Sequence, residues 1–294
     1  MTLSISAAFD SGNIIVRDAS DPAKVRLAIA KDHQSDFFQW FHFRVSGAVG
    51  QHVSLVIENA GDAAYLHGWT NYNAVISSDM EDWRRTPTRY DGKQLTIEAT
   101  LDTGALYVAY FAPYSSERHQ RLIARVRQDQ RARGTVLGQS LDGRDLDLIT
   151  LGEPGPDKRT IWITARQHPG ETMAEWWVEG LLDKLLDRDS DDAAALLERA
   201  VIHIVPNMNP DGSARGHLRT NAVGTNLNRE WNEPSLDKSP EVYFVRNKMD
   251  ETGCDLVLDV HGDEALPFNF IAGTEGIPSW SNRLAGLLER FKTA

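Results

Sequence analysis

Three short apolar runs that each end in polar residues constrain the fold of this chain more than any other feature. The runs span residues 159–165, 200–205 and 254–260. Their length and their branched and aromatic residues indicate buried β-strands. An amphipathic run from Glu171 to Asp187 follows the first strand and indicates a helix. This alternation favours a mixed α/β sheet with helices on both faces, in which ligands bind beyond the carboxyl ends of the strands.

Two of these strand ends carry residues with the chemistry and spacing of metal ligands. His168 and Glu171 follow the first strand, with Glu171 expected in the first turn of the helix, and His261 follows the third strand. Two His and one Glu can each bind zinc at about 2 Å and leave a position open for water, as in a catalytic zinc site. A His-x-x-Glu pair alone often has only a structural role. Together with the motifs around them, these residues predict one zinc ion per chain.

A second group of polar residues lies in the loops between these ligands and suits the recognition of a carboxylate. Arg219 precedes an irregular loop, residues 224–231, that carries Asn228 and Arg229. A guanidinium can bind a carboxylate through two parallel hydrogen bonds, and a neighbouring amide side chain can add another. A surface ion pair is the alternative for Arg229. Its place two loops from the predicted zinc site favours the carboxylate-binding role.

Four motifs, in order along the chain, resemble those of the zinc metallocarboxypeptidases typified by carboxypeptidase A. They are His168-Pro169-Gly170-Glu171, Asn209-Pro210-Asp211-Gly212, Asn228-Arg229 and the strand-end His261. The string Gly224 to Trp231 and the aromatic run Phe38 to Val45 are similar to the cytosolic carboxypeptidase branch in particular. The resemblance covers nearly the whole chain.

The resemblance implies a zinc-dependent enzyme that hydrolyses the carboxyl-terminal residue of peptides or proteins, with acidic, glutamate-bearing tails as a candidate substrate. It implies that the three predicted ligands hold the zinc ion. It also implies that Arg219 polarises the scissile carbonyl and stabilises the oxyanion, and that Asn228 and Arg229 bind the terminal carboxylate of the substrate.

The chain departs from the family pattern at two points. Asn226 stands where much of the family has an Asp that orients a zinc-bound His, and Asn can accept the same hydrogen bond without the charge. The family's general base is a Glu on a strand well beyond the third zinc ligand, and no motif in this chain matches it. We therefore expect the catalytic domain to be truncated at its carboxyl end. Glu264 is a candidate substitute base, but a solvated loop carboxylate or a partner of a zinc ligand is the favoured interpretation.

The first 115 residues have a different pattern, which predicts an antiparallel β-sandwich. Short alternating or apolar runs recur, separated by Gly, Asp and Asn turns, without a convincing helix. The aromatic run Phe37 to Val45 is interpreted as packing between the sheet, its partner sheet and the neighbouring domain rather than as a ligand-stacking surface. The predicted strands are 24–30, 37–46, 53–58, 94–101 and 105–111.

Helix signals appear where this pattern ends. Ser115 resembles a helix start, and residues 117–133 predict a helix that Gly134 ends. Residues 136–151 then predict a hairpin. The complete prediction is an α/β protein with two domains. They are a β-sandwich domain at 1–115 and a mixed-sheet α/β/α zinc carboxypeptidase domain at 116–294.

Composition excludes some functions. Lys and Arg number 31 against 42 Asp and Glu, for a net charge of −11 without a basic block, which argues against nucleic-acid binding. The one cysteine, Cys254, lies in an apolar run and is expected to be buried and inert. The chain starts without a signal-like segment and has no run of membrane-spanning length. We expect a cytoplasmic enzyme whose partner is a peptide or protein carboxyl terminus, and the sequence does not indicate an oligomeric state.

Three alternatives remain open from the sequence. A zinc deacylase of the aspartoacylase or succinylglutamate desuccinylase type shares the His-x-x-Glu and Asn-Arg elements. The Asn209 to Gly212 string and the leading sandwich argue against it. The second is a non-catalytic carboxylate-binding protein, if the chain ends at Ala294. An amidase acting on peptidoglycan peptides is the third, and only its substrate distinguishes it.

Overall fold

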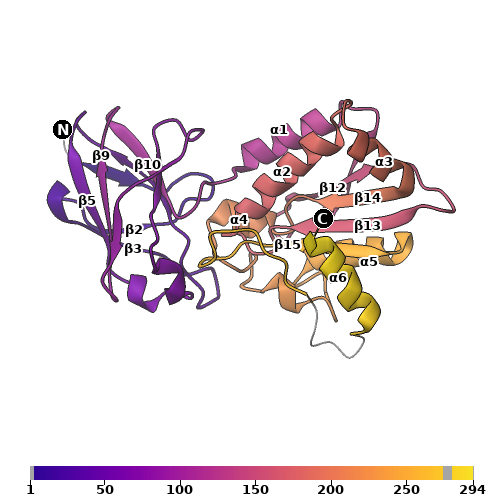
Figure 1. Cartoon of the computed structure of the whole chain (residues 1–294). Coiled ribbons are helices and arrows are strands. Elements are labelled where there is room, and N and C mark those ends of the chain that lie inside the picture. Colours follow the sequence, from indigo (N-terminus) through magenta and orange to yellow (C-terminus); the bar gives the residue numbers. More distant parts are fainter. Residues whose placement is uncertain (1–2, 274–279, 294) are drawn as a thin grey trace.

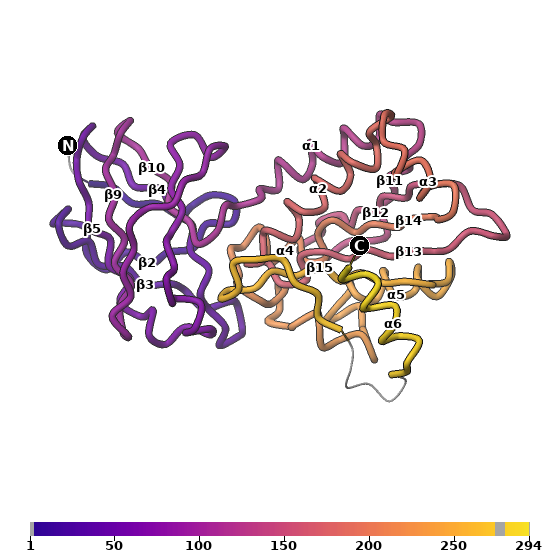
Figure 2. The backbone as a smooth tube through the Cα atoms, in the orientation of Figure 1, coloured from indigo at the N-terminus to yellow at the C-terminus, as the bar shows by residue number. Residues whose placement is uncertain are grey.

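The computed structural model describes residues 3–273 and 280–293 and contains two domains side by side (Figure 1). The first is a sandwich of strands, and the second is a sheet flanked by helices. The chain passes into the second domain just before α1 (Ser116–Val126), as Figure 2 shows. None of the helices in these described ranges is both long enough and apolar enough to cross a membrane.

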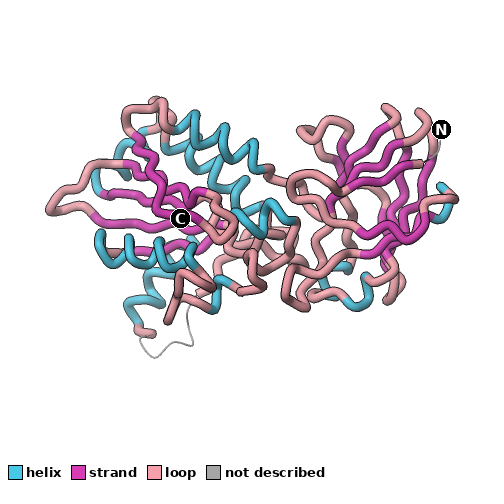
Figure 3. The backbone as a smooth tube through the Cα atoms, turned by 180° about the vertical axis from the view of Figure 1, so that it is seen from behind, coloured by secondary structure: helices cyan, strands magenta, loops and turns pink. Residues whose placement is uncertain are grey.

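The sandwich domain consists of two five-stranded sheets joined by loops and short 3-10 helices (Figure 3). One sheet has the order β1 (Ser4–Ser6), β4 (His42–Ser46), β10 (Ala105–Ala109), β6 (Val75–Ser77), β7 (Arg84–Arg85). The other has the order β2 (Ile15–Asp18), β3 (Val25–Ala28), β5 (His52–Ile57), β9 (Leu95–Thr100), β8 (Thr88–Tyr90). The 3-10 helices are η1 (Pro22–Lys24), η2 (Ala60–Asp62) and η3 (Leu66–Trp69). Neighbouring strands run antiparallel except β3 and β5, so the predicted antiparallel sandwich is confirmed apart from that parallel pair.

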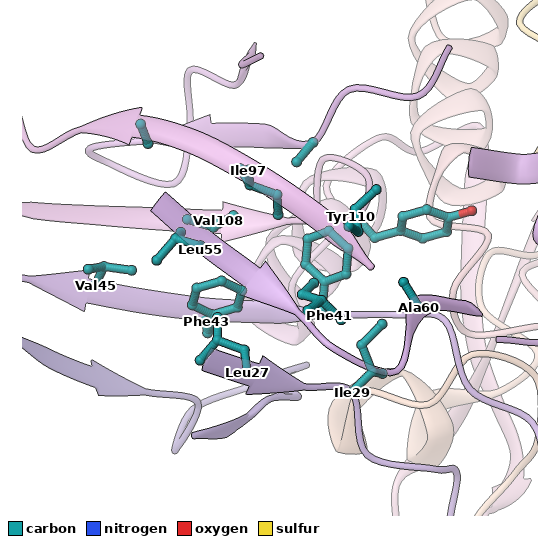
Figure 4. Packing of buried hydrophobic residues seen from close by; sticks show 14 of the residues in the cluster. Leu27, Ile29, Phe41, Phe43, Val45, Leu55, Ala60, Ile97, Val108 and Tyr110 are labelled. Carbon is teal, nitrogen blue, oxygen red and sulfur yellow. The ribbon is translucent and has the colours of Figure 1, made fainter. Parts of the chain in front are cut away.

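The core of this domain lies between the two sheets. Side chains from β4, β5, β9 and β10 meet there, among them Phe43, Leu55, Ile97 and Val108 (Figure 4). Strand β9 alternates buried and half-buried residues along its length, as its period-two pattern predicts. The aromatic run before and within β4 is buried except for the half-buried Phe37 and the exposed Arg44, so its interpretation as packing is confirmed.

The α/β domain has one mixed sheet covered on both faces, as predicted. Its order is β11 (Ala132–Gln139), β12 (Asp145–Leu151), β14 (Ala200–Val205), β13 (Arg159–Ala165), β15 (Leu256–Val260). Strand β13 is parallel to both of its neighbours, and β11, β12 and β14 are joined antiparallel. Figure 1 shows α1 with α2 (Met173–Leu185) and α3 (Asp191–Arg199) on one face, and α5 (Pro240–Thr252) on the other. The remaining helices are α4 (Pro210–Arg215), η4 (Leu227–Arg229) and α6 (Asn282–Thr293).

The predicted end of the first helix and the predicted burial of Cys254 are wrong. The helix that begins after the Ser115 cap ends at Val126 rather than near Gly134. The side chain of Asp129 accepts a hydrogen bond from the backbone N–H of Arg131 and forms a turn, after which β11 pairs with β12. Cys254, two residues before β15, is exposed in the described structure rather than buried.

Candidate metal centre

The three predicted ligands meet at one end of the central strands. Strands β13 and β15 are parallel neighbours with Ala165 opposite Val260, so the residues that follow them emerge side by side. His168 follows β13, and His261 follows β15 directly. Glu171 lies in the turn two residues before α2 rather than in its first turn. One ligand atom from each of the three side chains lies within 4.8 Å of the others.

The donor atoms of this cluster are arranged as a divalent cation requires. Glu171 Oε1 lies 2.7 Å from Nδ1 of His168, and its Oε2 lies 2.8 Å from Nδ1 of His261. The Nε2 atoms face the oxygens of Asn226, at 3.3 Å, and Asp259, at 2.8 Å. An imidazole that donates its proton from Nε2 keeps a lone pair on Nδ1 for a metal. Two such lone pairs and one carboxylate therefore point at a common position, and they fit zinc.

The electrostatics of the cluster also favour a positive charge at this position. Burial raises the pKa of Glu171, but hydrogen bonds from the two histidines outweigh it and lower that pKa to about 2. Burial lowers the pKa of His261, but hydrogen bonds to Asp259 and Glu171 outweigh it and raise that pKa to about 10. The Glu171 carboxylate thus stays ionised, and the positive charge of a protonated His261 lies beside it. A bound cation would supply that charge.

The residues that orient His261 form a network that sequence analysis missed. Gln167 Nε2 lies 2.7 Å from each oxygen of Asp259, and Thr164 Oγ1 donates to Asp259 Oδ1 at 2.9 Å. Trp231 Nε1 in turn donates to Gln167 Oε1 at 2.9 Å. The Asp-x-His spacing could have revealed Asp259, because residues two apart in a strand lie on the same face. Asn226 does contact His168, as the sequence predicted for that position.

A buried ion pair supports the turn that carries His168 and Glu171. Arg166 has a left-handed backbone, φ 54°, and is 1 % exposed. Its guanidinium donates to Glu175 at 2.7 Å and to the backbone oxygens of Pro169 and Tyr114. A non-glycine residue with positive φ is strained and persists only where its surroundings fix it. The pair with Glu175 is part of what fixes it here.

Glu175→Ala should therefore destabilise the protein by about 3–5 kcal/mol, because it leaves the buried Arg166 cation without its charged partner. Urea unfolding monitored by circular dichroism would measure the loss. Glu179→Ala, on the same helix, is the control, since Glu179 pairs with the half-exposed Arg118 and should contribute about 1 kcal/mol or less. Equal losses in the two variants would contradict a special role for the Arg166–Glu175 pair.

The predicted substrate-binding residues lie in two different environments. Arg219 is half-buried, with its guanidinium carbon 5.4 Å from the centre of the Phe37 ring and 5.6 Å from that of Tyr65. Arg229 is exposed at the end of η4 and donates to the backbone oxygen of Asn228 at 3.0 Å. Burial raises the pKa of the Tyr65 hydroxyl, and the charges of both arginines and of Glu171 act on it. One side chain of the sandwich domain therefore lies within electrostatic range of the metal cluster and of both arginines.

Glu264 does not have the solvated environment that the sequence suggested. Burial, with the charge of Glu171 adding to it, raises the pKa of Glu264 to about 7. Its Cβ and backbone oxygen lie against Gly68 of η3, where a side chain on Gly68 would clash with them. Glu264 is thus half-buried, with its backbone and Cβ against the sandwich domain. Its role in catalysis stays a prediction.

Comparison with known proteins decides the family. A model described as the cytosolic carboxypeptidase N-terminal domain matches residues 5–111, and a zinc carboxypeptidase model matches residues 120–264. A metallo-carboxypeptidase from Burkholderia cenocepacia is 47 % identical with a TM-score of 0.96, over 100 % of this chain and 80 % of that one. The chain belongs to the zinc carboxypeptidase family. The predicted family and its enzyme class, a peptide-bond hydrolase, are confirmed.

Two further relatives extend this result. A metallo-carboxypeptidase from Pseudomonas aeruginosa, solved with (2-guanidinoethylmercapto)succinic acid, is 47 % identical with a TM-score of 0.96, over 99 % of this chain and 78 % of that one. Cytosolic carboxypeptidase 2 of Danio rerio is 30 % identical over 84 % of this chain. The chain spans 38 % of the length of that Danio rerio protein. Zinc is the metal that the family description names.

Proposed function

We propose that this enzyme hydrolyses the carboxyl-terminal peptide bond of peptides or proteins, with one zinc ion held by His168, Glu171 and His261. The observation that supports this most strongly is the convergence of two Nδ1 atoms and one carboxylate within 4.8 Å. When bound, zinc polarises a carbonyl and lowers the pKa of a coordinated water from about 15.7 to about 7. Thr164 and Gln167 serve this chemistry indirectly, since they hold the Asp259 carboxylate that orients His261.

Recognition of the terminal carboxylate is assigned to Asn228 and Arg229. The exposed guanidinium of Arg229 can offer two parallel N–H donors to a carboxylate, which a peptide amide cannot accept in the same way. The Pseudomonas aeruginosa relative was solved with a derivative of succinic acid, which is a dicarboxylic acid. That ligand supports carboxylate recognition in this chain also.

Arg229→Ala should raise KM for peptide acids at least about tenfold and change KM for peptide amides little, because only the acid loses a charge-assisted bond of roughly 1.5–3 kcal/mol. Initial rates on matched acid and amide peptides would test this. Arg159→Ala is a suitable control, since Arg159 begins β13, at the end of the strand away from the metal cluster, and makes a surface ion pair with Asp255. Equal effects of Arg229→Ala on both substrates would refute the carboxylate-binding role.

Acidic tails and a cytoplasmic location are the finer parts of the proposal. Arg219 and Arg229 bring positive charge near the metal cluster, which suits glutamate-bearing carboxyl termini. The cytosolic branch of the family supports a cytoplasmic location, which fractionation of cells with an antibody would test. Peptides of equal length that end in Glu, Leu or Lys would test the preference. Slower cleavage of the Glu peptide would contradict it.

One assay separates this function from its alternatives. The full-length protein with zinc is incubated with peptide acids, the same peptides amidated at the carboxyl terminus, and N-acetylaspartate, and the products are identified by mass spectrometry. Release of single residues from the peptide acids is the expected result. Faster hydrolysis of N-acetylaspartate would indicate a deacylase instead. Tight peptide binding without turnover would indicate a binding protein.

A further inference from the structure

The short segment that carries Arg219 is held by a carboxylate of the other domain. Asp32, in the loop after β3, is 2 % exposed. Its two oxygens accept hydrogen bonds from the backbone N–H groups of Leu218, Arg219 and Thr220, at 2.6, 2.8 and 2.9 Å. The Thr220 hydroxyl adds a fourth bond at 3.0 Å. Successive N–H groups that converge on one anion fix the backbone between them, and they satisfy the buried charge.

A histidine on the same segment makes a second connection between the domains. The backbone N–H of His33 donates to Nε2 of His217 at 3.1 Å. The Nδ1 of His217 faces the backbone oxygen of Thr220 at 3.0 Å. Because Nε2 accepts a hydrogen bond, the ring proton lies on Nδ1 and is donated to Thr220. Both ends of the segment 217–220 are thus fixed against residues 32 and 33.

The same segment also contacts the turn that carries two of the proposed zinc ligands. The backbone oxygen of Leu218 accepts a hydrogen bond from the N–H of Gly170 at 2.9 Å. A Cβ added at Gly170 would lie 2.9 Å from that oxygen, so only glycine permits this approach. Asp32 on one side and the His168–Glu171 turn on the other therefore hold one strip of backbone between them.

The side chain of Arg219 is held by the sandwich domain as well. Its guanidinium lies within 6 Å of the ring centres of Phe37 and Tyr65, which is the range of cation–π attraction. Phe37 belongs to the same loop as Asp32, whose N–H donates to the Phe37 oxygen at 2.9 Å. Tyr65 is fixed through its backbone by the buried amide of Gln39, at 2.7 and 3.0 Å. Both rings are partly buried and pack against the core of the sandwich domain.

We propose that the sandwich domain forms part of the catalytic site, in that Asp32, Phe37 and Tyr65 are positioning residues for Arg219. Asp32 places the backbone of the 217–220 segment, and the two rings aim the guanidinium at the site where the oxyanion develops. This inference rests on the proposed function, because it takes Arg219 to be the oxyanion-stabilising residue. Oxyanion donors stabilise charge only where they are held in place before the reaction.

Asp32→Asn tests the backbone part of the proposal. An amide offers one acceptor oxygen and an N–H₂ group to three backbone donors, so at least one of them loses its partner. We expect hydrogen exchange at the amides of residues 218–220 to become about tenfold faster, with bound zinc unchanged. We expect kcat to fall by about tenfold to a hundredfold with KM nearly constant, as for a displaced catalytic group. Asp36→Asn is the matched control, since Asp36 lies in the same loop with its side chain 96 % exposed.

Double variants and ring variants separate positioning from general stability. In an Arg219→Ala background, Asp32→Asn should cause no further loss of kcat, whereas a merely structural role would lower it again. Tyr65→Leu and Phe37→Leu should lower kcat, and Tyr65→Phe should restore what Tyr65→Leu loses. These ring variants decide the question if Asp32→Asn does not fold.

The results of these experiments also separate a failure of the positioning role from a failure of the proposed function. Unchanged amide exchange in Asp32→Asn, or an additive loss in the double variant, would overturn the positioning role even in an active enzyme. If the wild-type protein does not hydrolyse peptides, the proposed function fails. The catalytic part of this inference then fails with it, while the exchange experiment still decides whether Asp32 holds the segment.

Discussion

Glu171→Gln should abolish zinc binding and, with it, the hydrolysis of peptides. Glutamine keeps the shape of the side chain but removes the negative charge that faces both Nδ1 atoms at 2.7 and 2.8 Å. Two neutral imidazoles alone do not complete a site of the His₂Glu kind. The loss of kcat/KM should exceed the 10²–10³-fold that removal of one oxyanion donor typically causes, because every contribution of the metal disappears together. Metal analysis of the dialysed protein and initial rates would measure both effects.

Two further variants give this prediction a graded control. Asp259→Asn keeps an acceptor for Nε2 of His261 but loses the charge, and should weaken zinc binding by about 10–100-fold rather than abolish it. Glu179→Gln changes a half-buried α2 glutamate that pairs with Arg118, and this variant should bind zinc normally. Full occupancy by zinc in Glu171→Gln, with activity retained, would show that the ion binds elsewhere.

Arg219→Ala should lower kcat by about 10²–10³-fold, or roughly 2.7–4 kcal/mol, with KM and bound zinc nearly unchanged. The reason is that the guanidinium is fixed and half-buried between two rings, so its charge acts on the transition state without reorganising. Steady-state kinetics on one peptide acid would test the prediction. Arg229→Ala is the comparison, since it should act on KM.

Comparing the two variants shows which arginine acts on kcat and which acts on KM. An interaction made only in the transition state lowers kcat, whereas loss of uniform binding raises KM. A raised KM with intact kcat in Arg219→Ala would place Arg219 in carboxylate binding instead. The positioning role of the sandwich domain would then concern substrate affinity rather than catalysis.

The sequence alone predicted the arrangement of the metal cluster, because each part of it has a local signal. Strands β13 and β15 appear as short apolar runs, and His168, Glu171 and His261 follow them at the spacing that zinc ligands show. Parallel neighbouring strands end at the same sheet edge, so candidate ligands that are ninety residues apart in the chain meet once β15 pairs with β13. The period-two pattern of β9 identified the sandwich in the same way.

Local pattern failed at two places in the chain. The α1 helix has the composition to continue past Val126, but a turn at Asp129 follows it and leads into β11, which pairs with β12. Cys254 lies in an apolar run, but it is exposed in the described structure. Apolar composition does not show whether another part of the chain covers a residue.

The sequence by itself therefore predicted the two fold types, the candidate ligand set and the family. Only the tertiary structure showed that Asp32, Phe37 and Tyr65 reach the segment around Arg219. Asp32 lies 186 residues before Leu218, and its carboxylate accepts a hydrogen bond from the Leu218 N–H. No periodicity or spacing in the sequence links two such positions. A carboxylate buried at a domain interface is stable only when donors from the other domain converge on it. Its partners can therefore be identified only once both domains are folded and in contact.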